Sequence, residues 1–501
     1  MAFATQRQFL SQAANQYAPQ ILETPRYHEA VQSALDSTER WEKRQCPLKA
    51  SVVIWLILAG VLYRAESLAD ILTKLLSQYR QHLPGLPLDA VTPEAACKAR
   101  ARLGYEPVAA VYHHLAKDIR GTASFQGFRL WAVDGTFLSI ADTPANEEKF
   151  GRITASRGKT AYPAVHVTEL VDTVTREVKN VVVGRCDKVD ERGDAMILIQ
   201  ELGKGDLLLT DCGFAAVWFF DQCLRRRIHI LARISNCWKP KIIRTLGDGD
   251  YVVSVRGDIP AAYRLKKATV RRVLRMIVYQ VGEDEPVRLL TDLFDVDKSS
   301  ALELAGLYHV RWESEIVYDE QKVHLIPLQH GKQKTVFRSK SPNGVLQEVY
   351  GMLITYNIVR GMIAEAANLH DLDPRNLSFV QSLNRIELAT PNYQQALDCT
   401  QREAVRSQLL KDLAGTLNPR PRRPRWYPRV VKIKMSNYGC KKPTDCGCHR
   451  DYTAETRAKP IVSKPLCSAL KQLSSSASSL AVPPQLGKVV PELIGNALVR
   501  P

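Results

Sequence analysis

The sequence predicts an α/β fold that follows a helical amino-terminal region. Apolar residues recur at helical spacing over residues 52–76. From residue 128 onwards, short apolar runs rich in β-forming residues alternate with helical patterns, which indicates a partly parallel sheet. The chain has 501 residues, of which 45% are hydrophobic and 24% are charged. This composition is typical of a globular protein and excludes collagen-like, coiled-coil and wholly disordered chains.

Residues 1–120 are predicted to form a helical domain that binds DNA. We expect Asp36, Ser37 and Thr38 to cap the start of a helix, because their side-chain oxygens can accept hydrogen bonds from the first backbone amides. The longest apolar run covers residues 52–63. It is too short to cross a bilayer, which needs about 20 residues.

A second helix of this region has clear signals at both ends. Thr92 is the expected cap, Pro93 suits the first turn, and Gly104 ends the helix. Arg100 and Arg102 lie inside it. These two side chains suit contacts to DNA phosphates, and solvated surface charges explain them equally well.

The α/β layer is predicted in two parts, residues 121–237 and 296–400, separated by a β-rich insertion over residues 238–295. In the first part we expect strands over 128–140, 164–172, 177–184, 207–210 and 228–234, and helices over 189–202 and 215–227. In the insertion, β-forming runs cover 251–255, 270–281 and 287–290. Long helices are expected over 299–325 and 344–367.

The charge of the chain is concentrated near its carboxyl end. The net charge is +17, and residues 401–450 hold 13 Lys and Arg residues against 3 Asp and Glu residues. Nucleic acid is the default partner of such a block, so residues 401–454 are predicted to contact DNA, with a solubilising surface as the alternative. Residues 455–501 are rich in Ser, Pro and Ala and are predicted to be disordered. Together they give a basic, partly disordered carboxyl-terminal tail.

Cellular compartment and two further motifs can be judged from the sequence. No signal-peptide pattern is visible and the 11 Cys residues are irregularly spaced, which predicts reduced thiols in a cytoplasm.

The Gly-Lys-Thr at residues 158–160 does not make a phosphate-binding loop, because that loop needs a Gly where Ile153 stands. A candidate zinc site, left open because its spacing is unusual, is formed by Cys440, Cys446, Cys448 and His449.

Two acidic residues are associated with apolar strands. Asp134 lies inside one apolar run, and Asp211 follows another. Burying a carboxylate is costly unless a positive group satisfies it, and at the carboxyl end of a strand that group is often a ligand or a metal. A turn or capping role explains either residue alone, and the pair together favours a site.

A third acidic residue lies on the predicted helix over residues 299–325. At about 100° per residue, four polar side chains of this helix fall within about 60° of one another. Glu315 can complete a metal site, and the basic members suit phosphate oxygens. A salt-bridged surface stripe is the alternative interpretation of this set, which comprises Tyr308, Arg311, Glu315 and Lys322.

The spacing of these four residues, Tyr-x2-Arg-x3-Glu-x6-Lys, resembles the Y-R-E-K signature of the insertion sequence four family of DDE transposases. The segment VDGTFLSIADTPAN resembles the first Asp region of that family, and LLLTDCGF resembles the second, with Cys212 in place of the usual Arg. KARARLGYEPVAAVY resembles its amino-terminal domain. The resemblance spans roughly residues 50–440 and also implies a β-rich insertion between the second Asp and the Glu.

The resemblance implies a ribonuclease-H-like catalytic core with Asp134, Asp211 and Glu315 as its acidic triad. Carboxylates suit Mg²⁺, and two Mg²⁺ ions, for which Mn²⁺ can substitute, would clamp the attacking and leaving oxygens of an in-line displacement. Water would first cut at the transposon end, and the freed 3′-hydroxyl would then attack target DNA. The implied function is a DNA transposase. The alternative is a catalytically inactive or domesticated DNA-binding protein derived from one.

The resemblance also implies partners and further contacts. Double-stranded DNA, as terminal inverted repeats and as target, is the expected partner of a homodimer in the bacterial cytoplasm, associated with the nucleoid when bound and not with a membrane. In some relatives a Trp of the insertion stacks a flipped base while a DNA hairpin forms. Val287 stands at that position here, and Trp238 lies far from it in sequence, so a hairpin intermediate is left open. The residues predicted to bind DNA are Tyr308, Arg311, Lys322, Arg338, Lys340, Arg100 and Arg102.

Overall fold

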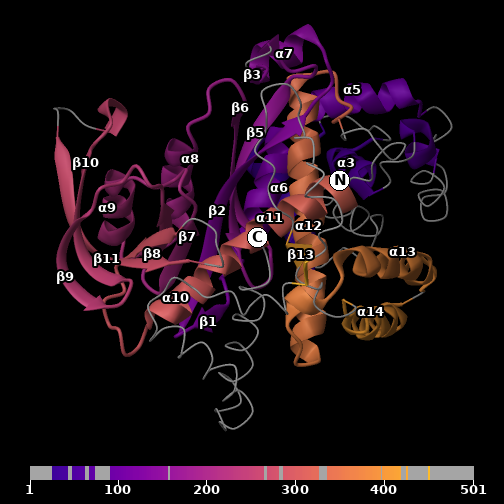
Figure 1. The fold of residues 1–501 in the computed structure, drawn as a ribbon. Helices are drawn as coiled ribbons and strands as arrows, with labels where there is room; N and C mark the ends of the chain where they lie inside the picture. The colour runs from indigo at the N-terminus through magenta and orange to yellow at the C-terminus, as the bar shows by residue number, and fades with distance from the viewer. Residues whose placement is uncertain are drawn as a thin grey trace. The chain divides into compact units, whose positions relative to one another are not determined.

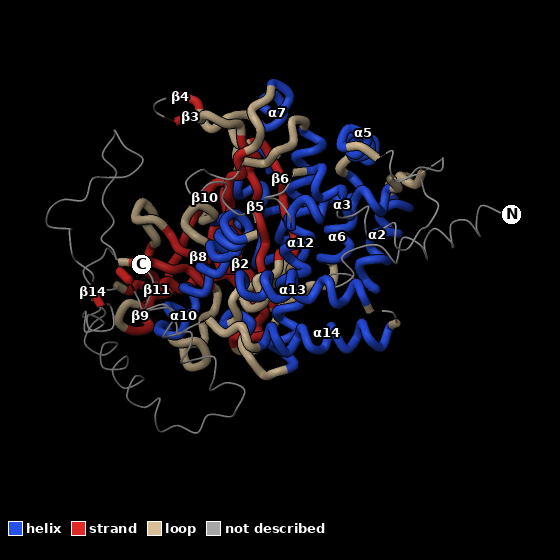
Figure 2. Tube along the Cα trace, turned by 90° about the vertical axis from the view of Figure 1, so that its right-hand side faces the viewer, coloured by secondary structure: helices blue, strands red, loops and turns tan. Residues whose placement is uncertain are grey.

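The structure is a computed structural model in which the chain divides into two compact units. It describes residues 25–42, 48–62, 67–73, 91–155, 158–263, 268–280, 286–325, 336–396, 398–418, 425–426 and 450–451. The first unit comprises residues 1–122, 133–201 and 313–417, and the second comprises residues 123–132, 202–312 and 418–501. Figure 1 labels the helices and strands, and Figure 2 distinguishes them by colour. The predicted zinc ligands, nearly all of the basic segment from residue 419 and the tail over 455–501 lie outside the described residues.

The first unit contains the helical amino-terminal region, as predicted. Its helices are α2 (Pro25–Ser37), α3 (Ala50–Leu62), α5 (Pro93–Leu103), α6 (Glu106–Ala116), α7 (Pro144–Phe150), α8 (Glu191–Leu198), α11 (Glu313–Asp319), α12 (Pro342–Leu369), α13 (Phe379–Gln395) and α14 (Cys399–Ala414). Most of α3 is buried, and it packs on α12, where a Cβ added at Gly351 would lie 2.9 Å from Ile57 Cγ2. The long apolar run is therefore a core helix. Among the described residues, no helix is both long and apolar enough to span a membrane.

Helix ends in this unit show where local signals were sufficient. Thr92 accepts a hydrogen bond from the Ala95 amide, and Gly104 ends α5 with a φ of 76°, which confirms the predicted limits of that helix. The predicted cap at Asp36, Ser37 and Thr38 is wrong. Helix α2 ends there, and the hydroxyls of Ser37 and Thr38 both donate back to the carbonyl of Ala34. Side chains that can cap a helix start can also bond the last turn of the preceding helix.

The strands of the first unit follow the predicted pattern. Strand β5 (Ala164–Asp172) pairs antiparallel with β6 (Val178–Arg185), and β2 (Phe128–Ser139) neighbours β5. Every residue of β5 is buried, as expected for a strand covered on both faces. The residues around the Gly-Lys-Thr form a small hairpin of β3 (Thr154–Ala155) and β4 (Gly158–Lys159), so no helix follows to bind phosphate.

The second unit contains a large mixed sheet. Strand β2, which both units share, pairs parallel with β7 (Asp206–Thr210), and β7 pairs parallel with β8 (His229–Ile234). Helix α9 (Val217–Arg225) connects β7 to β8, and β1 (Ala123–Phe125) pairs with β2. The short strands β13 (Arg425–Trp426) and β14 (Arg450–Asp451) pair with each other.

Residues 238–295 continue this sheet. Strand β12 (Val287–Thr291) pairs antiparallel with β8, and β11 (Thr269–Tyr279), β10 (Asp250–Asp258) and β9 (Lys241–Gly247) follow in that order. The three β runs predicted here are confirmed as strands, and β9 was missed. Every residue of β9 except Leu246 is exposed, so it lacks the apolar alternation that predicts a strand.

An apolar core holds the second unit together. Leucines of β7 and β8 contact apolar residues of β11 and β12 and of α10 (Ala301–Tyr308). The core residues include Leu207, Leu209, Leu231, Ile277, Leu289, Leu304 and Tyr308, each at most 4% exposed. The end of β7, which leads into Asp211, and the end of α10 are thus anchored in the same core.

Candidate catalytic site and its supporting contacts

Asp134 is held against the predicted signature segment in the first unit. Four buried residues, 130–133, precede it in β2, where apolar side chains favour the sheet interior. Asp134 Oδ1 accepts from the Gly135 amide at 2.9 Å, and its Oδ2 accepts from the Ser314 hydroxyl at 3.2 Å. The Tyr318 hydroxyl donates to the Asp134 carbonyl at 2.6 Å. Asp134 therefore contacts α11 directly, on the helix that carries Glu315.

The position of Asp134 within its strand differs from the strand-end interpretation. Strand β2 continues to Ser139, so the acid lies in mid-strand at the point where burial becomes partial. Gly135 permits this because an added Cβ would lie 2.8 Å from Glu191 Oε1 and 3.0 Å from His166 Nε2. A side chain at position 135 would therefore have to displace Glu191 and His166.

Lys322 is anchored on the same strand. Its ammonium group donates to the Thr136 hydroxyl and lies 5.6 Å from the centre of the Tyr318 ring. Thr136 is two residues beyond Asp134, so the two side chains point to the same face of β2. Lys322 and Asp134 are thereby brought together, and Glu315 is exposed one residue beyond Ser314.

The predicted single α-helix over residues 299–325 is wrong in detail. The segment consists of α10, a 3₁₀ turn (His309–Trp312), α11 and a π-helix (Glu320–His324). A 3₁₀ turn is tighter and a π turn wider than an α turn, so the 60° arc calculated for one ideal helix does not apply. Tyr308 and Arg311 are buried in the second unit, whereas Glu315 and Lys322 belong to the first.

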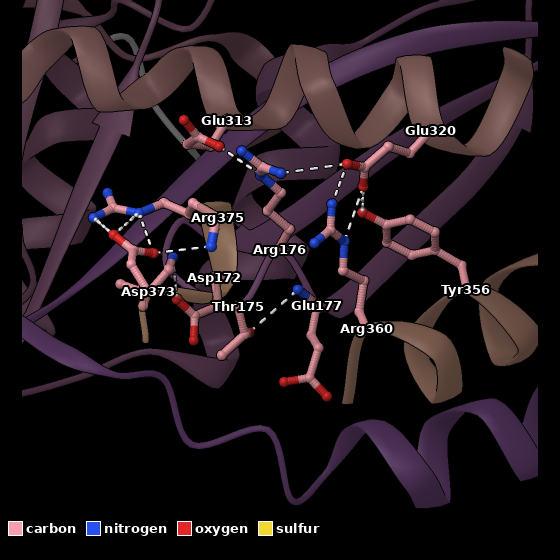
Figure 3. Close-up of polar contacts among 11 residues, drawn as sticks. Asp172, Thr175, Arg176, Glu177, Glu313, Glu320, Tyr356, Arg360, Asp373 and Arg375 are labelled. Carbon is pink, nitrogen blue, oxygen red and sulfur yellow. Dashed lines mark hydrogen bonds and ion pairs between the residues drawn. The ribbon is translucent and has the colours of Figure 1, made fainter. Parts of the chain in front are cut away.

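A buried ion network in the first unit holds the signature segment on both sides of Glu315 (Figure 3). Arg176, from the turn between β5 and β6, donates to Glu313 at 2.5 Å and to Glu320 at 3.3 Å. Arg360 of α12, wholly buried, forms an ion pair with Glu320 through two nitrogens. The Tyr356 hydroxyl donates to Glu320 at 2.9 Å. Glu320 is the first residue of the π-helix, so the network fixes the segment between Glu315 and Lys322.

Arg176 adopts an unusual backbone conformation to reach this network. Its φ of 63° is in the left-handed region, which residues other than glycine rarely occupy. Such a conformation costs on the order of 1–3 kcal/mol and persists only where the surroundings enforce it. The ion pairs of Arg176 with Glu313 and Glu320 stabilise this backbone conformation.

The sequence reasoning missed a second buried group beside Asp134. Glu169 of β5 is fully buried and accepts from the Gln321 amide at 3.1 Å. Burial, the largest cause, and the nearby Asp134 together raise the pKa of Glu169 to about 8, against the lowering effects of Gln321 and Lys322. Polar residues inside an otherwise apolar strand, as in AVHVTELVD, were the available signal. The network residues Arg176, Glu320 and Arg360 gave no local signal, because they are far apart in sequence.

The raised pKa of Glu169 predicts a pH-dependent stability. The ordinary pKa is 4.5 and the folded value is about 8, so between these values the folded chain keeps a proton that the unfolded chain has lost. Stability therefore falls as the pH rises through this window. We expect Glu169→Gln, which cannot ionise, to gain stability relative to the wild type as the pH rises from about 5 to about 8. Urea denaturation at several pH values measures this, and a constant difference would contradict it.

Asp211 belongs to the second unit, near Tyr308 and Arg311. It follows β7, whose residues are all buried, and its Oδ1 accepts from the Gly213 amide at 2.8 Å. Burial, the largest cause, and Asp211 together raise the pKa of Tyr308 to about 12, although Arg311 and Arg233 lower it. Tyr308, Arg311 and Asp211 are therefore electrostatic neighbours. Arg233 completes this group and was not predicted from the sequence.

His309 lies between Tyr308 and Arg311 in the sequence and stays neutral. Burial, with Arg311 and Arg233, lowers its pKa to about 4. Its Nε2 lies 3.3 Å from the Tyr279 hydroxyl of β11. The 3₁₀ turn is thus fixed to the sheet by a neutral imidazole, and the positive charge there comes from the two arginines.

The remaining residues predicted to bind DNA are more dispersed. The Arg100 guanidinium donates to Gln347 Oε1 at 3.1 Å and to the Ser339 hydroxyl at 3.3 Å, so it links α5 to α12. Arg102 donates to the Leu48 carbonyl at 3.1 Å. Arg338 and Lys340 are exposed just before α12.

The donor chemistry of the predicted triad suits a hard cation. Asp134, Asp211 and Glu315 offer only carboxylate oxygens, which Mg²⁺ and Mn²⁺ prefer. Asp134 and Glu315 lie in the first unit and Asp211 in the second. Across the described part of the chain, no three His, Cys, Asp or Glu side chains are grouped closely enough to hold a metal ion.

Comparison with known proteins identifies two matching family models. Residues 21–113 match the insertion element 4 transposase amino-terminal domain, and residues 126–358 match the transposase DDE domain. The chain is 29% identical over 414 residues to the transposase InsG for insertion sequence element IS4 of Escherichia coli (strain K12), which covers 81% of this chain and 89% of the relative. A cryo-EM structure of the piggyBac transposase synaptic complex with hairpin DNA covers 80% of this chain and 86% of its own, with 10% identity and a TM-score of 0.42.

Proposed function

Because the chain belongs to the insertion sequence four family of DDE transposases, enzymes that cut and transfer DNA strands, we propose that it cleaves and joins DNA at the ends of its own insertion sequence. The observation that carries the proposal is the direct contact between Asp134 and α11. Two of the proposed catalytic segments, far apart in sequence, meet through the Ser314 and Tyr318 hydroxyls.

The proposed catalytic core is ribonuclease-H-like, with Asp134, Asp211 and Glu315 as its acidic residues. The parallel strands β2, β7 and β8, with α9 connecting β7 to β8, and the antiparallel pair of β5 and β6 support it. Asp211 follows β7, at the carboxyl end of a parallel strand, where ligands of α/β sheets bind.

Enzymes of this family use divalent metal ions, and we propose two Mg²⁺ ions, with Mn²⁺ as a substitute, held by the three carboxylates. When bound, the ions would activate a water and neutralise charge on the attacking and leaving oxygens. The chain itself positions the acids: Ser314 and Gly135 orient the Asp134 carboxylate, and Gly213 orients that of Asp211.

Basic side chains are proposed to hold the DNA phosphates near the cut. Lys322 donates to Thr136, which is two residues beyond Asp134 on β2. Arg311 and Asp211 both lie close enough to Tyr308 to affect its pKa. A guanidinium can bind a phosphate through two hydrogen bonds, and an ammonium acts as a compact point charge. Arg338, Lys340, Arg100 and Arg102 are proposed as further phosphate contacts. We propose that a homodimer holds the two DNA ends and the target DNA.

A cleavage assay tests the proposed function. Purified protein with Mg²⁺ is expected to nick a duplex that carries its own terminal inverted repeats, and to do so at the repeat boundary. A duplex with scrambled repeats and a reaction with chelator are the controls. Binding without any cleavage, in either Mg²⁺ or Mn²⁺, would contradict the proposal and favour an inactive DNA-binding protein derived from a transposase.

A further inference from the structure

The end of the sheet formed by β9, β10 and β11 has an unusual charge arrangement. In antiparallel pairs, residues that oppose each other point to the same face. Arg256 of β10 opposes Arg271 of β11, and the neighbouring pair Ser254 and Lys241 lies two residues away on β10. Val252, on the same face, opposes Arg244 of β9. One face therefore carries Lys241, Arg244, Arg256 and Arg271, here called the basic sheet face.

The four residues of the basic sheet face are exposed. None of the four forms an ion pair with another residue in the described part of the chain. Asp258 is an exposed acid on the same face, opposite Thr269, which leaves three net positive charges. Like charges that oppose each other across a strand pair are destabilising. The opposed pair of Arg256 and Arg271 therefore lowers the stability of the protein when no anion is bound.

Two other arginines of β11 differ from the basic sheet face, because each forms an ion pair with an acidic residue. Arg275 lies on the same face of β11 but is buried, and it pairs with Asp250 at 2.6 Å. Arg272 points to the opposite face, where α9 packs, and it pairs with Asp221 of that helix. Figure 1 shows α9 beside β10 and β11. Where the sheet is covered its arginines have acidic partners, and where it is open they face solvent.

We infer that the basic sheet face binds the phosphate backbone of duplex DNA. Neighbouring strands are about 4.8 Å apart and alternate residues along a strand about 6.8 Å apart, which gives closely spaced cations suited to a closely charged polyanion. The face carries guanidinium and ammonium groups, and its other exposed residues, Asp258, Thr269 and Val273, are not aromatic, so it suits phosphates better than stacked bases. The inference rests on the proposed function for the identity of the DNA, and it adds a binding surface outside the catalytic residues.

A matched pair of variants tests this inference. The first variant replaces Lys241, Arg244, Arg256 and Arg271 with Gln. The control replaces four exposed basic residues of the same unit, outside that face, with Gln, and so changes the net charge equally. These residues are Lys204, Arg226, Arg227 and Lys298. Binding to a duplex carrying the inverted repeats is followed by fluorescence anisotropy, with chelator present, at salt concentrations from about 50 to 200 mM.

The two variants are expected to differ in their salt dependence. Each lost phosphate contact lowers the slope of log affinity against log salt by about 0.9, so the first variant should lose about 3 to 4 in slope and the control less than about 1. Equal slopes for the first variant and the wild type would overturn the inference. If the first variant instead self-associates in light scattering with an unchanged slope, the charges protect an edge strand and the inference is also overturned. Failure of the wild type to cleave would count against the proposed function alone, because binding is measured without cleavage.

Discussion

Glu315→Ala is expected to lower the rate of end cleavage by about 10³-fold or more while leaving DNA affinity nearly unchanged. Removal of a metal-binding carboxylate costs several kcal/mol of transition-state stabilisation, and about 1.4 kcal/mol corresponds to tenfold in rate. Asp211→Ala should act in the same way. For Asp134 the sharper change is Asn, because an amide oxygen can still accept from Gly135 or Ser314 while the charge is lost.

A matched control separates loss of a specific carboxylate from loss of an acidic charge. Glu387 is exposed on α13, away from the proposed catalytic residues in sequence, and Glu387→Ala should cleave like the wild type. Cleavage by gel assay and binding by anisotropy are measured on each variant. Near-full cleavage by Glu315→Ala would show that the proposed acidic triad is assigned incorrectly.

Glu320→Ala is expected to lower the free energy of unfolding by about 3–5 kcal/mol, because it leaves Arg176 and Arg360 buried without their shared partner. Tyr356→Phe removes only the hydroxyl that donates to the charged Glu320 carboxylate and should cost about 1.5–3 kcal/mol. Chemical denaturation followed by circular dichroism measures both. A loss of less than about 1 kcal/mol for Glu320→Ala would show that the network contributes little.

The network offers a matched comparison for its effect on the catalytic segment. Tyr112 is also fully buried in the first unit, and its hydroxyl donates to the Val178 carbonyl at 3.1 Å. Tyr112→Phe removes a hydrogen bond to a neutral carbonyl and should cost about 1 kcal/mol. If Glu320 positions the segment from Glu315 to Lys322, Tyr356→Phe lowers cleavage more than Tyr112→Phe does. Equal cleavage by the two variants would assign the network a structural role only.

The family and the enzyme class predicted from the sequence are confirmed by the comparisons. Most elements could also be predicted, because their signals are local. Helix α5 has its cap and its terminal glycine within twelve residues of each other, and β7 is a short apolar run before an acid. The strand order and the pairing of β12 with β8 depend on long-range contacts and were not predictable from such patterns.

The supporting contacts of the site could not be predicted, for a physical reason. The 3₁₀ and π turns of the signature segment are stabilised by Tyr279 of β11, Arg176 of the turn between β5 and β6, and Arg360 of α12. A helical wheel assumes one uniform helix and cannot include those contacts. Glu169 was missed because no spacing in the sequence relates it to Asp134 or Gln321, although its environment raises its pKa.

The most direct test of the central claim is a structure of the protein bound to its terminal repeat DNA in Ca²⁺, which binds oxygen ligands without requiring turnover. The account predicts that carboxylate oxygens of Asp134, Asp211 and Glu315 all lie about 2.3–2.6 Å from bound Ca²⁺, beside the phosphate at the repeat boundary. Bound Ca²⁺ at that phosphate without one of these three carboxylates among its ligands would contradict the account.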